Sequence, residues 1–464
     1  MTRQIRFNAF QMNAAGHQSP GLWTHPRDTS HRYTEAAYWT ELAQLLESAR
    51  FDAIFLADVL GVYDVYQGSV DAALRGGVQV PLNDPLALVP LMAGATRHLG
   101  FGVTAALTYE HPYTFARRMS TLDHLTGGRI GWNIVTGYLD SAARNLGLNR
   151  QLGHDERYDL ADEYLDVVYK LWEKSWDDDA VINDKARGIY TDPAKVHPIN
   201  HHGRHYQVPG IHLCEPSPQR TPLLYQAGTS PRGTRFAARH AEATFVSGPS
   251  KTVVKRYADD LRAAVRQTGR DGDALIIYAQ ALIITGETEA EARAKYEEYR
   301  RHIDIEAALA LLSGWTGVDF SRYPLDATID YIDLDAGRSA LASFSQADPD
   351  RKWTVREAAE YIGLGGRGPV LVGDARQVAD QLESWIDETG IDGFNLAFAV
   401  AHDSMADVVK HIVPELQRRG RYRHSYEDGA LRHKVFGQGP RLPASHAGRQ
   451  VSIHPAPANT LAAA

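Results

Sequence analysis

The feature that most constrains this chain is a regular alternation of short apolar runs with longer amphipathic stretches. Each run has the length and composition of a buried strand, and most are followed by apolar residues at helical spacing. The helical segment 35–49, for example, places Tyr38 and Leu42 on one side. The apolar runs lie at 5–10, 52–58, 99–106, 129–136, 222–228, 243–248, 274–286 and 392–399.

Eight strands with helices between them predict an α/β protein of the (β/α)8 TIM-barrel type. A doubly wound sheet is the alternative. The count of eight favours the barrel, as do the nearly continuous apolar strands, because barrel strands are covered on both faces.

Two segments break the rhythm, at about 175–221 and 303–372, and the chain ends in a basic, then Pro- and Ala-rich stretch. We expect a single barrel domain over 1–420, with both insertions over the C-terminal face of the strands. Residues 421–464 are expected to form an extended tail, since such a composition does not build a core.

The charge and cysteine content exclude several classes of protein. The 464 residues carry a formal net charge of −8, which gives no support for a nucleic-acid partner or a polybasic membrane surface. Cys214 is the only cysteine, so no internal disulfide can form and a reducing compartment is expected. No signal peptide and no run of roughly 20 apolar residues is evident. We expect a soluble, cytoplasmic protein without a nucleic-acid or membrane partner.

Residues 153–158 and 225–233 each lead into a helix pattern, after the fourth and fifth strands. Backbone N–H groups and the dipole at a helix start favour an anion. His154 lies just before the first of these helices and Tyr158 about one turn into it, so both can face one anion. A capped surface helix would have the same sequence.

Polar side chains also lie at the ends of other strands. Asp58 ends the second strand, Thr104 the third, and Asn133 lies in the fourth. The loop after the first strand carries His17 and Trp23. Barrel active sites lie at the carboxyl ends of the strands. Together these residues indicate a ligand about the size of a flavin mononucleotide (FMN).

Other motifs carry less weight. The sequence GLGGRG at 363–368 matches G-x-G-x-x-G, but it follows a helix pattern and precedes an apolar run, the reverse of a dinucleotide fingerprint. We interpret it as a flexible loop. The histidines of 201–205 lack the partners of a zinc motif and indicate a surface turn, so we expect no metal. Cys214 has no evident base beside it and is a weak candidate nucleophile.

Several long motifs, taken in order, resemble the bacterial-luciferase-like flavin monooxygenases. Within that family the chain is most similar to the branch typified by nitrilotriacetate monooxygenase component A. The first 80 residues and "CEPSPQRTP" look closest to dimethylsulfide and N-acetyl-S-(2-succino)cysteine monooxygenases. The motifs are "FLADV" (55–59), "TLDHLTGGRIGWNIVT" (121–136), "HDERYDLADEYLDVVYKLW" (154–172) and "QAGTSPRG" (226–233).

The resemblance implies that reduced FMN and O₂ are co-substrates, and that a separate NAD(P)H-dependent flavin reductase supplies the reduced flavin. NAD(P)H would then act only indirectly. A homodimer or homotetramer is expected. The flavin contacts implied by the motifs are Asp58, Thr104, His154, Tyr158 and Ser230, with backbone from Gly228 and Thr229.

For a thioether, the implied reaction is oxidative cleavage of a carbon–sulfur bond. His17 is the candidate acid or base, and Phe10, Trp23 and Tyr63 are candidates for the substrate wall. A carboxylated thioether would need a cation, for which the sequence offers His17, Arg232 or Arg322. Carbon–nitrogen cleavage of an aminopolycarboxylate, sulfone oxidation, a deazaflavin-dependent dehydrogenase and a non-catalytic flavin-binding barrel remain alternatives.

Overall fold

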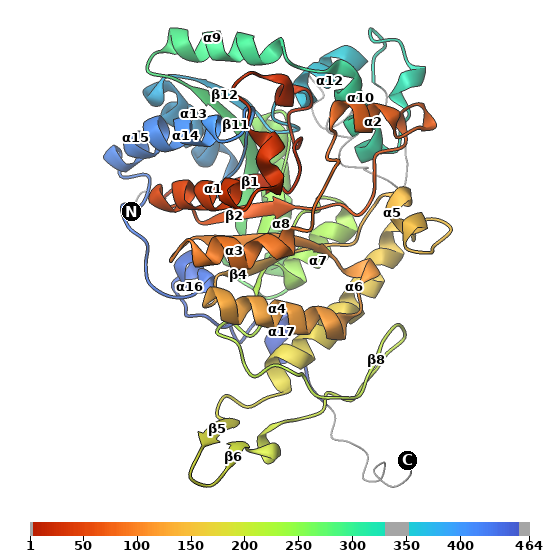
Figure 1. The fold of residues 1–464 in the computed structure, drawn as a ribbon, viewed down its shortest axis with the longest axis vertical. Helices are drawn as coiled ribbons and strands as arrows, with labels where there is room; N and C mark the ends of the chain where they lie inside the picture. Colours follow the sequence, from red (N-terminus) through yellow and green to blue (C-terminus); the bar gives the residue numbers. More distant parts are fainter. Residues whose placement is uncertain (1–2, 330–351, 454–464) are drawn as a thin grey trace.

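The computed structural model describes residues 3–329 and 352–453, and it contains a closed barrel of parallel strands (Figure 1). The barrel strands are β1 (Arg6–Met12), β2 (Ala53–Ala57), β3 (Gly100–Ala106), β4 (Ile130–Val135), β9 (Leu223–Gln226), β10 (Ala243–Val246), β11 (Ile276–Thr285) and β13 (Gly393–Ala397). Each pairs with its neighbours in the ring, which closes where β10 pairs with β11 and β13 with β1. This confirms the predicted (β/α)8 barrel.

Helices pack around this ring, and residues at their ends explain where they begin and end. Helix α4 starts at Pro112, whose missing N–H is no loss at a first helical position. The ring of His111 accepts a hydrogen bond from the backbone N–H of Tyr113, and Gly127 ends the helix with φ of 61°. The bounds 112–126 agree with the sequence pattern.

The other helices are α1 (Ala36–Ser48), α2 (Asp71–Gly76), α3 (Leu88–Gly94), α5 (Asp140–Asn145), α6 (His154–Tyr169), α7 (Pro231–His240), α8 (Lys251–Gln267), α9 (Glu289–Arg300), α10 (Ile305–Thr316), α12 (Val355–Ile362), α13 (Ala375–Thr389), α14 (Asp403–Asp407), α15 (Val413–Arg418), α16 (Leu431–Phe436) and α17 (Ala447–Gln450). A short strand outside the ring, β12 (Val370–Gly373), pairs with the second half of β11.

Aromatic rings fill the inside of the barrel. The ring of Phe245 lies 4.1 Å from that of Phe55 and stacks between those of Tyr225 and Tyr278. Gly102 makes room for this layer, since a Cβ there would lie 2.8 Å from Phe55. Space for a ligand is therefore left above this layer, at the carboxyl ends of the strands.

Residues 421–453 do not form an extended tail. Leu431 and Val435 of α16 are buried against the aromatic layer of the barrel. The guanidinium of Arg432 forms a two-point ion pair with Glu242, at 2.6 and 2.8 Å, and both side chains are buried. The described part of the expected tail is thus held on the barrel, where its arginine pairs with an acid 190 positions away.

The insertion at 175–221 lies at the opposite end of the barrel from the one expected. It follows α6, which runs antiparallel to the strands, and so it begins at their amino ends. Gln219 donates to the backbone oxygen of Ile130, the first residue of β4. The insertion carries the hairpins β5–β6 (Val181–Asp184, Ile189–Thr191) and β7–β8 (His201–His202, Gln207–Val208), far from α10 and α12 in Figure 1.

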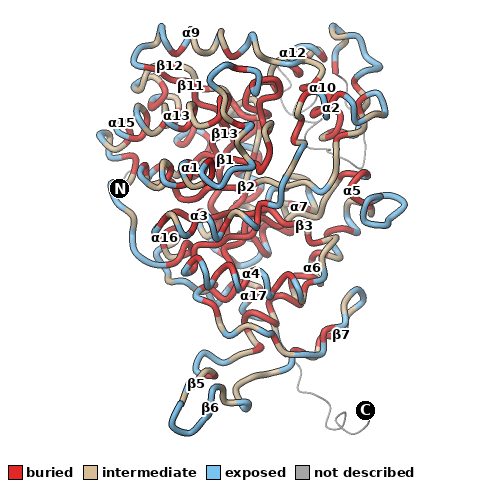
Figure 2. Tube along the Cα trace, in the orientation of Figure 1, coloured by how far each residue is buried: buried red, intermediate tan, exposed pale blue. Residues whose placement is uncertain are grey.

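The second insertion, 303–372, overlies the carboxyl ends of the strands as expected. Helices α10 and α12 pack with α2 around a separate apolar cluster that includes Tyr63, Leu311 and Trp353. Figure 2 shows buried residues here as well as in the barrel. The part of this insertion at 330–351 lies outside the described residues.

Candidate active site

Two adjoining cavities, of about 330 and 210 Å³, open at the carboxyl ends of the barrel strands. Cavities of a few hundred cubic ångströms are the usual size of small-molecule sites. Both are lined by strand-end residues and by two residues of the second insertion. The shared lining residues are Asp58, Val135, Ala227, Gly228, Thr229, Trp315 and Arg367.

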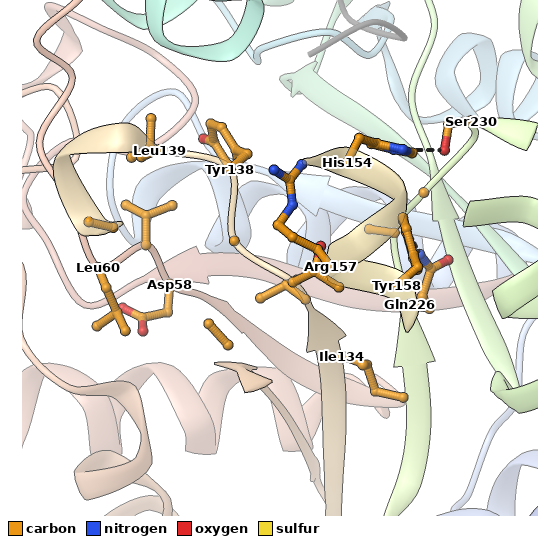
Figure 3. A pocket seen from close by; sticks show the side chains of 18 of the residues that line it. Asp58, Leu60, Ile134, Tyr138, Leu139, His154, Arg157, Tyr158, Gln226 and Ser230 are labelled. Atoms are coloured by element: carbon orange, nitrogen blue, oxygen red, sulfur yellow. Dashed lines mark hydrogen bonds between the residues drawn. The ribbon is translucent and has the colours of Figure 1, made fainter. Parts of the chain in front are cut away.

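One corner of the larger cavity brings together the two helix starts singled out in the sequence. The Nε2 atom of His154 lies 3.2 Å from the Oγ atom of Ser230 (Figure 3). Ser230 also caps α7, because its Oγ accepts a hydrogen bond from the N–H of Gly233 at 3.1 Å. Tyr158, one turn into α6, lines the same corner. The corner offers a hydroxyl, a phenol and an imidazole to one anion.

The glycines of this corner keep it open. A Cβ at Gly228 or at Gly233 would lie 2.8 Å from the Oη atom of Tyr158. Any larger residue at either position would therefore move the phenol or fill the corner.

The smaller cavity is lined by amide and hydroxyl groups from the barrel strands. Asn133 donates to the Oγ1 atom of Thr104 at 2.9 Å, and its own Oδ1 atom is buried without a partner. The Oε1 atom of Gln226, which lines the larger cavity, is likewise unpartnered. Buried acceptors usually find a donor. A flat heterocycle with ring N–H groups, such as a flavin, would supply one, so these residues fit the cofactor that the motifs imply.

Asp58 lines both cavities at the end of β2. Burial, and second the nearby charge of Asp84, raise the pKa of its carboxyl from an ordinary value of 3.8 to about 7. A carboxyl with such a pKa can hold or release a proton near neutral pH.

His17 lies behind the cavity wall and not in it. Its ring packs edge-on against Phe10 at 4.4 Å, and its Nε2 lies 3.2 Å from Nε2 of Gln18. Phe10 and Gln18 line the smaller cavity, whereas His17 does not. Burial lowers the pKa of His17 to about 3, so the ring is neutral. The structure gives it no direct contact with a ligand in these cavities.

Of the three residues expected on the substrate wall, only Phe10 lines a described cavity. Trp23 is 46% exposed, and its indole N–H donates to the backbone oxygen of Gly76. Tyr63 is buried, and its hydroxyl lies 2.9 Å from that of Tyr138. Tyr138, which lines the larger cavity, stands between Tyr63 and the ligand space. Trp23 therefore lies outside both cavities, and Tyr63 is joined to the larger one through Tyr138.

Sequence reasoning missed Trp315, Arg367 and Gln280. Trp315 lies near the end of α10, in a segment that carried no site prediction. Arg367 stands inside GLGGRG, which we expected to be a flexible loop, and Gln280 lies in the middle of an apolar strand. A polar residue inside an otherwise apolar barrel strand can indicate a binding site, because burying its polar group is costly unless another group forms a hydrogen bond with it.

The histidines of 201–205 and Cys214, considered above as a metal site and a nucleophile, make structural contacts. His201 pairs with Glu163 on α6 at 3.2 Å, and the thiol of Cys214 lies 3.7 Å from the backbone oxygen of Arg117. In the ranges 3–329 and 352–453, no group of three or more His, Cys, Asp or Glu side chains is arranged to hold a metal ion. Among these same residues, no helix combines the length and apolarity needed to span a bilayer.

Comparison with known proteins decides the family. The model of the luciferase-like monooxygenases matches residues 19–393. The chain belongs to this family. Several of its relatives are also named monooxygenases, which confirms both the resemblance read from the motifs and the assignment as an enzyme.

Among those relatives is the dimethyl-sulfide monooxygenase of Hyphomicrobium sulfonivorans, which is 50% identical over 98% of this chain and 94% of its own. The long-chain alkane monooxygenase of Geobacillus thermodenitrificans is also 50% identical, over 96% of this chain and 97% of its own. The crystal structure of DmoA from H. sulfonivorans has a TM-score of 0.91 and covers 97% of this chain and 96% of that one.

Two further relatives confirm the branch read from the motifs. Nitrilotriacetate monooxygenase component A of Aminobacter aminovorans is 34% identical over 89% of this chain and 92% of its own. N-acetyl-S-(2-succino)cysteine monooxygenase of Bacillus subtilis is 33% identical over 93% of this chain and 96% of its own. The relatives are thus named for substrates as different as dimethyl sulfide, long-chain alkanes and nitrilotriacetate, so membership alone does not give the substrate.

Proposed function

We propose that this chain is the oxygenase of a two-component, FMNH₂-dependent monooxygenase that cleaves a carbon–sulfur bond of an organic thioether. The observation that carries the proposal is the corner formed by His154, Tyr158 and Ser230 beside a cavity lined by unpartnered barrel amides. A phosphate at that corner and a flat heterocycle over the barrel mouth would occupy part of both cavities and leave the space beside Arg367 for a substrate.

The residues proposed to hold the flavin divide into two groups. His154, Tyr158 and Ser230, with the backbone of Gly228 and Thr229, face the phosphate. Thr104, Asn133 and Asp58 face the ring and its side chain. When bound and reduced, the flavin supplies the electrons that activate O₂, and the protein supplies position and a dry surrounding.

The overall reaction balances as a hydroxylation followed by a collapse. One atom of O₂ replaces a C–H bond of the carbon beside sulfur by C–OH. The other atom leaves as water with two electrons and two protons from reduced flavin. The product is a hemithioacetal, which breaks its C–S bond to give a thiol and a carbonyl compound, with the hydroxyl proton passing to sulfur.

Asp58 is proposed to handle the proton in this collapse. It lines both cavities, and its raised pKa leaves protonated and ionised forms both available near neutral pH. We no longer assign the acid–base role to His17, since its ring lies behind Phe10 and Gln18. His17 is proposed instead to position Gln18, whose other end accepts from Gln280 at 3.0 Å.

The similarity to an alkane monooxygenase raises hydroxylation of a hydrocarbon as a second candidate. The cavity walls argue against it. Asp58 and Arg367 line both cavities, and an alkane beside the flavin would offer neither of them a partner. Leaving buried polar groups unpaired typically costs about 1–3 kcal/mol each. Carbon–nitrogen cleavage of an aminopolycarboxylate remains the alternative that these polar walls would tolerate.

The experiment couples the protein to a flavin reductase with NADH, FMN and ¹⁸O₂, and offers a panel of thioethers. The expected result is a free thiol and an equal amount of carbonyl product that carries ¹⁸O when read before exchange with water. An intact sulfoxide as the main product would refute the proposal, as would faster release of an amine from an aminopolycarboxylate. Flavin binding without any oxygenation would leave only a flavin-binding barrel.

The oligomeric state is a separate proposal, a homodimer or homotetramer, carried over from the motifs. Light scattering on the purified chain tests it directly, and a monomer at micromolar concentration would contradict it.

A further inference from the structure

The loop GLGGRG, which the sequence reading left without a function, places a positive charge in the ligand space. Arg367 lines both cavities. Within residues 3–329 and 352–453, its guanidinium forms no ion pair with a carboxylate. The neighbours that act on its charge are the hydroxyls of Tyr63, Tyr138 and Tyr257, and Trp315 stacks with it at 5.4 Å.

Three hydrogen bonds hold the loop that carries Arg367, two of them from the barrel side and one from α12. The N–H of Gly365 donates to the hydroxyl of Ser19 at 3.1 Å, and Gln280 donates to the backbone oxygen of Gly365 at 2.8 Å. The hydroxyl of Tyr361 donates to the backbone oxygen of Gly368 at 2.7 Å. These bonds hold the backbone on both sides of Arg367, so the expectation of a flexible loop is wrong.

The glycines explain why the motif has this composition. Gly365 and Gly366 have φ of 87° and 73°, in the left-handed region that favours glycine. A Cβ at Gly366 would also overlap Gln18 and Gln280, and one at Gly368 would overlap the backbone of Gln280. The loop 363–368 therefore packs closely against β11. Its arginine, Arg367, lines the two cavities.

The other cations considered for a substrate carboxylate already have partners. Arg232 donates to Asp162 at 2.6 Å and to Asp159 at 3.0 Å. Arg322 pairs with Asp319 at 3.0 Å and is largely exposed. Arg367 differs from both because it faces the cavity without an acid.

Arg367 is half-buried, so its charge has lost part of its hydration, and without an anion that loss is costly. Tryptophan and tyrosine rings offer a partial cation–π compensation, typically about 0.5–2 kcal/mol. Burial lowers the pKa of Arg367, which records the same desolvation. A ligand that brings its own negative charge would remove this cost.

We infer that Arg367 binds an anionic group of the substrate, a carboxylate in the simplest case, and so selects carboxylated thioethers over neutral ones. The identity of the substrate as a thioether rests on the proposed function. The binding of an anion by Arg367 does not. The flavin phosphate has its own corner on α6 and α7, whereas Arg367 and Trp315 both come from the insertion that covers the mouth. A guanidinium matches a carboxylate in a two-point geometry.

The test measures binding by titration calorimetry, on protein saturated with oxidised FMN, so that turnover is not needed. The probes are (propylthio)acetate and the matching (propylthio)acetamide, which differ in charge and little in shape. The variants are Arg367→Met and Arg367→Gln, which remove the charge, and Arg367→Lys, which keeps it. Arg322→Met is the control, since it removes an exposed arginine of the same insertion.

We expect the wild-type protein to bind the carboxylate at least 10-fold more tightly than the amide. Arg367→Met and Arg367→Gln should remove that preference and leave the amide within about twofold, while Arg367→Lys keeps part of it and Arg322→Met changes nothing. The inference is overturned if the wild-type protein shows no preference or binds neither probe. Equal losses for both probes would overturn it too, as would weaker FMN binding in the Arg367 variants without a probe.

The two proposals fail in different ways. A carboxylate that binds through Arg367 but yields no thiol under the coupled assay contradicts the proposed reaction and leaves the binding site intact. Thiol release from neutral and charged thioethers at equal kcat/KM, unchanged by Arg367→Gln, contradicts the binding site and leaves the reaction intact.

Discussion

The Nε2 atom of His154 lies 3.2 Å from the Oγ atom of Ser230, although the two residues are 76 positions apart. The contact joins the starts of α6 and α7, which follow β4 and β9, two neighbouring strands of the ring. Two helix starts that meet at one point offer their dipoles and free N–H groups to a single anion.

The first prediction concerns this corner. Ser230→Ala and Tyr158→Phe each remove a hydroxyl from the proposed phosphate site. A hydrogen bond to a charged group is worth about 1.5–3 kcal/mol, so FMN affinity should fall by roughly 10- to 150-fold. Fluorescence titration of FMN measures the change.

Ser250→Ala is the matched control for the first prediction. Ser250 caps α8 as Ser230 caps α7, by accepting a hydrogen bond from a backbone N–H, but it lines neither cavity. Both changes should cost a similar cap energy, typically about 1 kcal/mol. FMN affinity that is unchanged in Ser230→Ala, or equally weakened in Ser250→Ala, would remove the phosphate assignment.

The second prediction concerns Asp58 and pH. Because burial raises its pKa to about 7 in the folded protein, the native state holds this proton more tightly than the unfolded state does. Folding stability contributed by Asp58 is therefore present below pH 4 and is lost as the pH rises to 7. Asp58→Asn should melt at nearly the wild-type temperature at pH 4 and above it at pH 7. Thermal scans of the flavin-free protein across this range check the sign, and a constant difference would contradict it.

The third prediction concerns the ion pair that closes the amino end of the barrel. Arg432→Met leaves Glu242 buried without its partner, which typically costs about 3–5 kcal/mol. Arg418→Met, which removes an exposed partner of Glu415, should cost at most about 1 kcal/mol. Urea unfolding distinguishes the two, and equal midpoints would show that the Arg432–Glu242 pair does not stabilise the fold.

The fourth prediction concerns the reductant. NADH alone should not bleach FMN in the presence of this protein, because the only G-x-G-x-x-G segment runs from a helix into β12 and is packed on the barrel. A dinucleotide site needs the order strand, glycine loop, helix. Stopped-flow absorbance without added reductase is the measurement, and rapid bleaching would mean that the chain binds NADH itself.

The sequence was sufficient where structure depends on neighbours along the chain. The eight apolar runs predicted the barrel strands to within about two residues, and the proline and glycines around 112–126 set the bounds of α4. The helix starts at His154 and Ser230 are local features too, which is why the anion corner could be predicted from the sequence.

The sequence-based predictions that failed concern contacts between residues far apart in the chain. Nothing near Arg432 in the sequence indicates Glu242, and nothing near Arg367 indicates Gln18 or Gln280. Glycine-rich composition was interpreted as flexibility, whereas here the glycines allow close packing. The location of 175–221 was in principle predictable, since a segment between a helix and the next strand lies at the amino end of a barrel.

The last prediction tests this interpretation of the glycines. Gly366→Ala places a methyl group where Gln18 and Gln280 meet and forces a side chain onto a residue with φ of 73°. Gly437→Ala is matched, because Gly437 has φ of 69° but no atom within 4 Å of its Cβ position. Both should lose about 1–2 kcal/mol of stability from the backbone, and Gly366→Ala a further 1–3 kcal/mol or so from overpacking. If the loop were flexible, urea unfolding would give the two variants equal losses, and binding of (propylthio)acetate would be unaffected. A larger loss in Gly366→Ala, together with weaker carboxylate binding, is expected if the close approach is what directs Arg367 to the cavity.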